Sequence, residues 1–333
     1  MSVFAPGMVN LWQTIDSYGI DPAPLFDAES INVTLPIDPC VRIPYQKIDR
    51  IRANAANLSG DEAFGLKVAA NYGPTQLGAL GYAWLASLTL RRAFQRLERF
   101  IRVVNDKAEV LIEDRENCIV IAFKLDIPSE NITVRDDGAL ALVTKMSRAI
   151  CGRNFRLQAV NFKHAEPKDL KPYYEFFGCP LNFDQPANEL LIPLDIADKE
   201  LVGANPELAL LNDKVMTRYL ARMNQHDVVA RVQAALIDQL PNGSVTDDSV
   251  ADSLYMSVRT LHRKLVDVDS NFKTILVEIR RSLADQYIMD NSLTLTEISL
   301  LLGFSEQSSF SRAFRKWTGR TPSEARQQRT DNS

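Results

Sequence analysis

The most constraining stretch of this 333-residue chain lies near its carboxyl end, from Asn291 to Arg326. Thr294 and Glu297 have the spacing of a capping box, in which a hydroxyl and a carboxylate satisfy free N–H groups at the start of a helix. Gly303 is expected to end that helix, because glycine adopts a left-handed backbone at least cost. We expect Ser305 to cap a second helix directly afterwards. A helix, a glycine turn and a capped helix form the helix-turn-helix pattern.

The second of these helices separates apolar from cationic side chains. Phe310, Phe314 and Trp317 recur at spacings of four and three residues, which predicts one buried face. The remaining positions are polar or basic and contain no acid: Gln307, Ser308, Ser311, Arg312, Arg315 and Lys316. The whole chain carries a net charge of -4, so its basic charge is concentrated in this segment rather than spread over the surface. A cationic, acid-poor helix face is suited to a DNA groove.

These residues also carry a family resemblance. The segments that match are Leu301 to Ser305, Ser309 to Phe314, Trp317 to Gly319 and Thr321-Pro322. Together they resemble the signature of the AraC/XylS family of bacterial transcription regulators. Any amphipathic pair of helices would explain the spacing of the phenylalanines. It would not explain why the glycine turn and the Thr-Gly-x-Thr-Pro ending occur together with that spacing. The resemblance implies an all-α C-terminal domain of two helix-turn-helix motifs joined by a long helix.

The first motif of such a pair is weaker in this sequence. Thr246 opens one predicted helix and Ser257 caps the next. Tyr255 stands where the second motif has its glycine, and a left-handed backbone there would cost roughly 1 kcal/mol. Asp269 likewise stands where the family usually has glycine. These departures put the fine geometry of the first motif in doubt, but not its existence.

The segment from Phe272 to Asp290 predicts the joining helix. At 1.5 Å per residue, about 19 residues would span roughly 28 Å. Successive major grooves on one face of DNA lie about 34 Å apart. One rigid helix therefore suits a spacer between two reading helices, and a single chain could read an asymmetric site.

Position-for-position resemblance assigns the DNA contacts. The residues that it directs toward the bases are Arg259, His262 and Arg263 in the first motif, and Ser308, Ser309 and Arg312 in the second. Arginine suits the two acceptors of guanine, and histidine or serine can donate or accept. The residues expected at DNA phosphates are Arg315, Lys316 and Arg320, with the helix starts near Thr246 and Thr294.

The first two hundred residues follow another pattern. Residues 119 to 127 alternate between apolar and other side chains, which predicts a half-buried strand, and Val110 with Ile112 indicates its hairpin partner. Helical spacing surrounds these strands. We therefore predict an α+β domain in which helices cover a small antiparallel sheet.

A looser resemblance covers about residues 20 to 200. Its motifs are Phe64-Gly65-Leu66, Leu77-Gly78-x-Leu80-Gly81-Tyr82, Phe162-x-His164 and Phe176-Phe177-Gly178-Cys179-Pro180. They resemble the arabinose-binding-type sensor domain of the ornithine-utilisation branch of the family. The resemblance implies an effector-sensing and dimerisation domain at residues 1–205, a bridging helix at 206–226 and a DNA-binding domain at 227–329.

Three features of the first domain each have two interpretations. The arginines between Arg91 and Arg102 could bind an anionic effector, DNA or polymerase, or could form a solvated helix face. The small residues between Thr75 and Leu88 could line an effector pocket or a subunit contact, or could belong to a tightly packed internal helix. His164 near Glu166 could bind metal or transfer protons, or could be a hydrogen-bonded structural residue.

The sequence contains no recognisable Ser-His-Asp set, phosphate loop, acid pair or metal-ligand spacing, so we expect no enzyme activity, metal or cofactor. Dispersed cysteines, no signal-peptide pattern and no membrane-length apolar run predict a cytoplasmic protein. The expected partners are double-stranded promoter DNA, RNA polymerase, an unidentified small-molecule effector and a second copy of the chain. We expect an effector-responsive activator. The alternatives are a ligand-independent regulator whose first domain only dimerises, and an enzyme or small-molecule carrier domain fused to a DNA reader.

Overall fold

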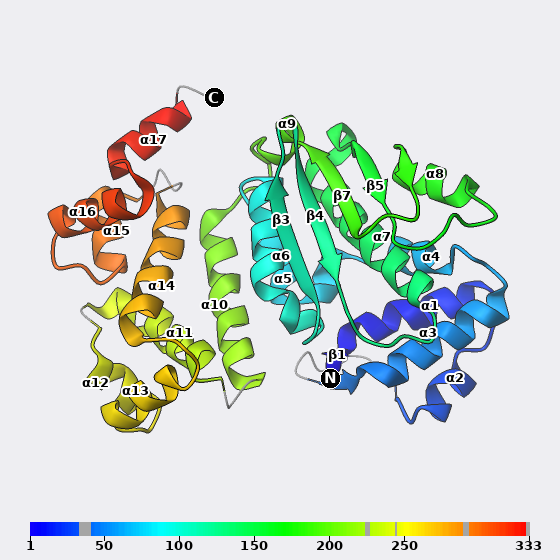
Figure 1. Cartoon of the computed structure of the whole chain (residues 1–333), viewed down its shortest axis with the longest axis horizontal. Helices are drawn as coiled ribbons and strands as arrows, with labels where there is room; N and C mark the ends of the chain where they lie inside the picture. The colour runs from blue at the N-terminus through cyan, green and yellow to red at the C-terminus, as the bar shows by residue number, and fades with distance from the viewer. Residues whose placement is uncertain (33–40, 224–226, 244, 289–292, 331–333) are drawn as a thin grey trace. The chain divides into compact units, whose positions relative to one another are not determined.

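The computed structural model describes residues 1–32, 41–223, 227–243, 245–288 and 293–330 (Figure 1). The chain divides into two compact units, Met1–Ala209 and Leu210–Ser333. Helix α10 (Pro206–Met223) crosses this division, so the bridging role predicted for residues 206–226 stays a prediction. Its last three positions, 224–226, lie outside the described residues. Within the described ranges, no helix has the length and apolar character needed to span a membrane.

A five-stranded sheet forms the centre of the N-terminal unit, in the order β3-β4-β7-β5-β6. The predicted hairpin of β3 and β4 is confirmed, with Ile112 opposite Ile121. The prediction of a half-buried strand over residues 119–127 is wrong, because β4 ends at Lys124 and its first four residues are all buried. The sheet is antiparallel except for β5 and β6, which pair in parallel. A separate two-stranded sheet, which the sequence did not indicate, joins β1 and β2. The strands are β1 (Ser2–Phe4), β2 (Arg42–Pro44), β3 (Glu109–Asp114), β4 (Cys118–Lys124), β5 (Ala159–Asn161), β6 (Leu181–Asn182) and β7 (Asn188–Pro193).

Helices pack on this sheet and on one another, and the predicted α+β class is confirmed (Figure 1). Helix α6 contacts β3, α7 contacts β7, and α7 also packs closely against α4. The close packing depends on Gly65 of α4, where a Cβ atom would lie 2.4 Å from the carbonyl oxygen of Val134. The helices are α1 (Met8–Ser17), α2 (Ala23–Ala28), α3 (Tyr45–Ser59), α4 (Phe64–Ala70), α5 (Ala79–Leu85), α6 (Leu90–Val104), α7 (Ile132–Cys151), α8 (Lys171–Phe177) and α9 (Leu194–Ala197), with short 3-10 helices η1 (Ala5–Gly7), η2 (Pro74–Leu77) and η3 (Gly152–Asn154).

The small-residue segment between Thr75 and Leu88 is two helical pieces rather than one. Gly78 has φ +57° and separates η2 from α5. A Cβ atom on Gly81 would lie 1.6 Å from the carbonyl oxygen of Pro74, so only glycine fits there. Trp84 is fully buried but Tyr82 is 48% exposed, so the segment is tightly packed with one part at the surface.

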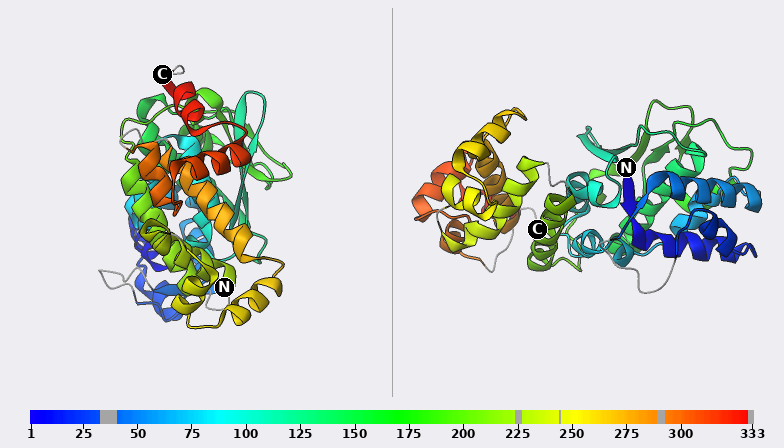
Figure 2. Two further views of the ribbon diagram at one scale, coloured as in Figure 1. Left: turned by 90° about the vertical axis from the view of Figure 1, so that its left-hand side faces the viewer. Right: turned by 90° about the horizontal axis from the view of Figure 1, so that it is seen from below.

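All described elements of the C-terminal unit are helices, as the two views of Figure 2 also show. In Figure 1, α12 and α13 lie beside one end of α14, and α15 and α16 lie beside its other end. The helices share one core, in which Leu261, Ile298 and Phe310 are fully buried. They are α11 (Val228–Gln239), η4 (Leu240–Asn242), α12 (Asp247–Ser253), α13 (Val258–Val266), α14 (Phe272–Tyr287), α15 (Leu295–Leu301), α16 (Gln307–Thr318) and α17 (Pro322–Thr330).

The joining helix is shorter than the sequence indicated. Helix α14 has 16 residues instead of about 19, and ends at Tyr287. Residues 289–290, the end of the predicted span, lie outside the described residues. At 1.5 Å per residue α14 is about 24 Å long. The distance between two reading helices must therefore include the width of the helices at each end of α14.

Candidate nucleic-acid interface and internal cavity

The second helix-turn-helix consists of α15 and α16. The predicted capping box is present: the N–H of Glu297 donates to Thr294 Oγ1 at 3.1 Å, and the N–H of Thr294 donates to Glu297 Oε2 at 2.7 Å. Gly303 has φ +69°, and the N–H of Phe304 donates to the carbonyl of Ser299 at 2.9 Å. This is the six-to-one hydrogen bond of a Schellman turn, which reverses the chain between two helices.

Gly303 is required by packing as well as by its backbone. A Cβ atom there would lie 2.7 Å from the carbonyl oxygen of Gly243 and 3.0 Å from Leu240 Cδ2. The turn therefore packs directly against the end of η4. Arg280 of α14 holds it from another side, since its guanidinium donates to the carbonyls of Leu302 and Gly303 at 2.9 Å each.

Arg280 was not marked by any sequence pattern. It lies on a helix with other basic residues, and only the fold places it under the turn. Its guanidinium carbon is 4.3 Å from the ring centre of Phe304, and burial lowers its pKa. Arg280 therefore stabilises the angle between α14 and α15 rather than facing DNA.

The start of α16 corrects the sequence prediction. The N-cap residue is Glu306, not Ser305, and its side chain makes no cap hydrogen bond to the helix backbone. Instead, Glu306 Oε1 accepts hydrogen bonds from Ser308 Oγ at 2.6 Å and Ser309 Oγ at 3.2 Å. Arg312 Nη2 lies 3.9 Å from the same oxygen. The hydrogen bonds from Ser308 and Ser309, helped by the charge of Arg312, lower the pKa of Glu306.

All three predicted base readers of α16 are thus collected around one carboxylate that sequence reasoning did not single out. Arg312 also donates to Ser309 Oγ at 3.2 Å. The side chain of Arg312 is 77% exposed and that of Glu306 is 62% exposed, so the group lies at the surface. Phe310 and Phe314 are buried on the opposite face, as their spacing predicted. The only sequence signal for Glu306 was an acid at the start of an otherwise acid-free helix face.

The first helix-turn-helix consists of α12 and α13 and has the same turn. Thr246 and Ser257 are the two N-caps, as predicted. Tyr255 has φ +56°, and the N–H of Met256 donates to the carbonyl of Ala251 at 3.0 Å, as at Phe304. Tyr255 therefore adopts the left-handed backbone whose cost the sequence raised, and its side chain is 97% exposed. The substitution of tyrosine for glycine has therefore left the geometry of the turn unchanged.

Helix α13 exposes all three of its predicted base readers. Arg259, His262 and Arg263 are exposed, and Leu261 and Leu265 are buried on the other side. His262 Nε2 lies 2.8 Å from Asp247 Oδ2 in the first turn of α12. Both motifs therefore have an acid in contact with a predicted base reader.

The residues predicted to hold phosphates fall into two groups. Arg315, Lys316 and Arg320 are exposed cations on or after α16. Thr246 and Thr294 are exposed at helix starts, but an acid stands in the first turn of each helix: Asp247 and Asp248 in α12, and Glu297 in α15. These acids would repel a phosphate, so the cations are the stronger candidates.

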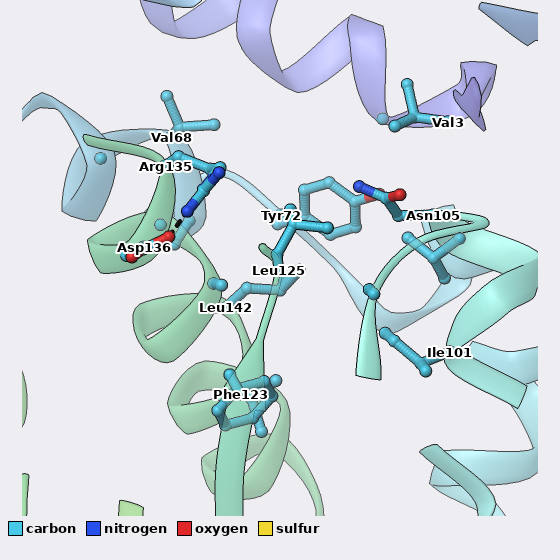
Figure 3. Close-up of a pocket in the computed structure, with 18 of the residues that line it drawn as sticks. Val3, Val68, Tyr72, Ile101, Asn105, Phe123, Leu125, Arg135, Asp136 and Leu142 are labelled. Atoms are coloured by element: carbon cyan, nitrogen blue, oxygen red, sulfur yellow. Dashed lines mark hydrogen bonds and ion pairs between the residues drawn. The ribbon is translucent and has the colours of Figure 1, made fainter. Parts of the chain in front are cut away.

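A cavity of about 260 Å³ lies inside the N-terminal unit (Figure 3). Its walls come from α1, α3, α4, α6, α7 and the strands β3 and β4. Leu77, from the small-residue segment, also lines it, so the packed-segment and pocket interpretations are both supported. The wall residues labelled in Figure 3 are mostly apolar, with four polar exceptions, Tyr72, Asn105, Arg135 and Asp136.

His164 is hydrogen-bonded within the N-terminal unit, which agrees with the structural interpretation of this residue. Its Nδ1 lies 2.8 Å from the carbonyl oxygen of Ala165, and its Nε2 lies 2.8 Å from Asp137 Oδ1. Because a carbonyl can only accept, Nδ1 carries a proton. Tyr173 also donates to the fully buried Asp137, at 2.5 Å.

The arginines of α6 have partners in their own unit. Arg91 pairs with Asp114 and Asp198. Arg96 donates to Ser87 Oγ at 3.0 Å. These contacts favour the interpretation of a solvated helix face over a free cationic binding surface.

Comparisons with known proteins agree with both units. A family model for the arabinose-binding N-terminal domain of AraC transcription regulators matches residues 19–201, which is more than half of the chain. A helix-turn-helix domain model matches residues 250–328, which include the second motif and all of the first except the start of α12.

Relatives that align over 80 to 95% of this chain are named as regulators. The ornithine utilization regulator of Pseudomonas aeruginosa is 28% identical over 95% of this chain and 94% of its own length. The HTH-type transcriptional regulator VirS of Mycobacterium tuberculosis is 26% identical over 83% of this chain and 82% of its own. The HTH-type transcriptional regulator VqsM of Pseudomonas aeruginosa is 25% identical over 80% of this chain and 84% of its own. With two turns of equal geometry in the matched C-terminal unit, this chain belongs to the AraC family of DNA-binding transcription regulators.

Proposed function

We propose that this regulator is an effector-responsive activator that reads two adjacent major grooves, one with α13 and one with α16. The observation that carries the proposal is the repeated turn. In each motif a left-handed residue, Tyr255 or Gly303, is followed by a six-to-one hydrogen bond of 3.0 or 2.9 Å. Equal turns present α13 and α16 to solvent in the same way within their motifs.

The side chains that would contact the bases lie at the surface: Ser309 is half-buried and the other five are exposed. Arg259 and Arg263 would each contact guanine. His262 would contact a base either after breaking its hydrogen bond to Asp247 or with that hydrogen bond kept. On α16, Ser308, Ser309 and Arg312 would contact bases as one group with Glu306. Arg315, Lys316 and Arg320 would hold phosphates and fix the position of the helix without reading sequence.

The N-terminal unit would sense a small molecule. Its internal cavity supports this role, because a preformed and mostly apolar cavity is the usual form of a ligand site. A ligand that binds one conformation of the unit more tightly than another would alter its contacts with α10 or with a second copy of the chain, and so change DNA binding or access to RNA polymerase. We place the protein in the cytoplasm with promoter DNA.

A matched pair of variants tests the DNA-reading part. Arg263→Ala should lower the preference for the cognate site over random DNA by about 1 to 3 kcal/mol, because one base contact is lost. Lys316→Ala should weaken binding to cognate and random DNA alike and reduce the salt dependence. Competition binding at about 150 mM salt measures both quantities. Equal effects of both variants on cognate and random DNA would refute the assignment.

A further inference from the structure

We propose that the cavity of the N-terminal unit binds an uncharged, mainly apolar small molecule through one acceptor oxygen, which Tyr72 and Asn105 hydrogen-bond. The inference rests on the sensing role proposed above and adds the chemistry of the molecule that is sensed.

The walls set the apolar character and the size. Val3, Val68, Ile101 and Leu142 line the space from β1, α4, α6 and α7, and Figure 3 shows them around it. Apolar cavities of about 150 Å³ bind benzene in other proteins. By proportion, a cavity of about 260 Å³ suits a molecule of roughly ten non-hydrogen atoms.

Two arginines that line the cavity are already paired with acids. Arg135 Nε donates to Asp136 Oδ1 at 2.7 Å, and the Arg135 side chain is only 7% exposed. Arg52 Nη1 lies 3.8 Å from Asp49 Oδ1. A carboxylate or ammonium on the ligand would therefore be buried without a free counter-charge, which is strongly unfavourable. An uncharged ligand avoids this penalty.

One end of the cavity reaches the surface. Lys124 and Glu109 line it there, and their side chains are 54% and 61% exposed. They lie 3.8 Å apart as an ion pair on β4 and β3. A ligand can therefore enter beside these exposed side chains, whose ion pair lies in solvent.

Two polar groups at the wall have unused hydrogen-bonding capacity. Among the residues that the structure describes, the Tyr72 hydroxyl has no partner. Asn105 accepts from the N–H of Lys107 at 3.1 Å through Oδ1, and its amide N–H groups have no partner in the described ranges. Burial raises the pKa of Tyr72, so its hydroxyl keeps its proton. Both groups can then donate, and an acceptor oxygen complements them.

The position of Tyr72 is set by its neighbours. A Cβ atom on Gly7 would lie 2.9 Å from the Tyr72 hydroxyl oxygen, so the glycine leaves room for that group.

Figure 3 shows the Tyr72 ring and the Asn105 amide among the apolar wall residues. Polar groups inside a protein are normally satisfied, so a pair left open at a cavity wall indicates a ligand or a water molecule.

The test is calorimetric titration of the full chain with 2-nonanone, a neutral chain with one acceptor oxygen. Matched probes are nonanoate, nonylammonium and lysine, which carry charges. We expect 2-nonanone to bind at least about tenfold more tightly than each charged probe. Tyr72→Phe should weaken its binding by about threefold to tenfold, as expected for one hydrogen bond, without lowering thermal stability. Ala139→Leu, which fills the cavity, should abolish binding, and Leu58→Ala on the exposed face of α3 should leave it unchanged.

Failure of 2-nonanone to bind, tighter binding of a charged probe, or unchanged affinity in Tyr72→Phe would overturn the inference. The last result would mean that only water satisfies the hydroxyl. DNA affinity is measured in the same samples with and without probe. Probe binding that follows the predicted order but leaves DNA affinity unchanged supports the cavity chemistry and removes the sensing role. Loss of site-specific DNA binding in every sample would instead refute the DNA-reading proposal.

Discussion

Replacing Tyr255 by glycine should stabilise the C-terminal unit. Tyr255 has φ +56°, a backbone that costs roughly 1 to 2 kcal/mol for a residue with a Cβ atom and little for glycine. Its side chain is 97% exposed, so the substitution removes almost no packing. Glycine also gains freedom in the unfolded chain, which offsets about 0.5 to 1 kcal/mol. The difference between these two terms is a gain of about 0 to 1.5 kcal/mol, with a central value of about 0.75 kcal/mol.

Hydrogen exchange of the full chain measures this gain locally, at the buried amides of Leu261 and Leu265 in α13. Tyr255→Ala is the matched control, because alanine loses the same side chain but keeps the backbone strain. It should stay within about 0.5 kcal/mol of the original protein. The equivalent glycine gives the opposite result: Gly303→Ala should cost about 2 kcal/mol or more, since its Cβ atom would meet the Gly243 carbonyl at 2.7 Å. If Tyr255→Gly matched Tyr255→Ala or destabilised the unit, the strain argument would be refuted.

Three further predictions concern Glu306 at the start of α16, the partly buried His164 and the crossing of α4 with α7. Glu306→Gln should strengthen binding to both cognate and random DNA by about fivefold or less, because it frees Arg312 and removes a negative charge. Glu324→Gln, at the start of α17, should leave the bonding of Arg312 intact. Fluorescence anisotropy at two salt concentrations measures the DNA affinity of both variants. Burial lowers the pKa of His164, but the hydrogen bond and charge of Asp137 outweigh this effect and raise the pKa overall. The resulting contribution to folding stability is therefore full below about pH 6.5 and is lost as the pH rises through the raised pKa. Thermal melts of the original protein should show a steeper loss of stability toward alkaline pH than those of His164→Gln, and parallel stability curves for the two proteins would contradict the argument. Gly65→Ala should destabilise the N-terminal unit by about 1 to 3 kcal/mol, because the backbones of α4 and α7 must separate. In Gly138→Ala the Cβ atom would meet its nearest neighbour at 3.4 Å, so this variant should be neutral or stabilising. Urea titration of both variants measures the difference.

The sequence was most informative where local chemistry determines the structure. Thr294, Glu297 and Gly303 act on neighbouring backbone groups within ten residues, so their spacing located α15 and its turn. The same reasoning placed the second cap at Ser305, one residue early, because the side chain at Glu306 bonds forward to other side chains instead of to the helix backbone. Capping preference describes one hydrogen bond and cannot account for a competing network.

Features that depend on long-range packing were not predictable in this way. Strands β1 and β2 have three residues each and pair across forty positions, too short for an alternating pattern to appear. The cavity depends on side chains from several helices and strands, and only Leu77 lay in a segment suspected from its small residues. The assignment of Arg259, Ser308 and the other DNA contacts came from resemblance and stays a prediction, although their exposure is compatible with it.

The most direct test of the account is a hydroxyl-radical footprint of the full chain on a genomic site selected against excess random DNA. The original protein should protect two regions about 10 base pairs apart, one for each reading helix. Arg263→Ala should weaken protection of one region, and Arg312→Ala should weaken the other. A single protected region, or loss of the same region in both variants, would contradict the proposal that α13 and α16 read adjacent grooves.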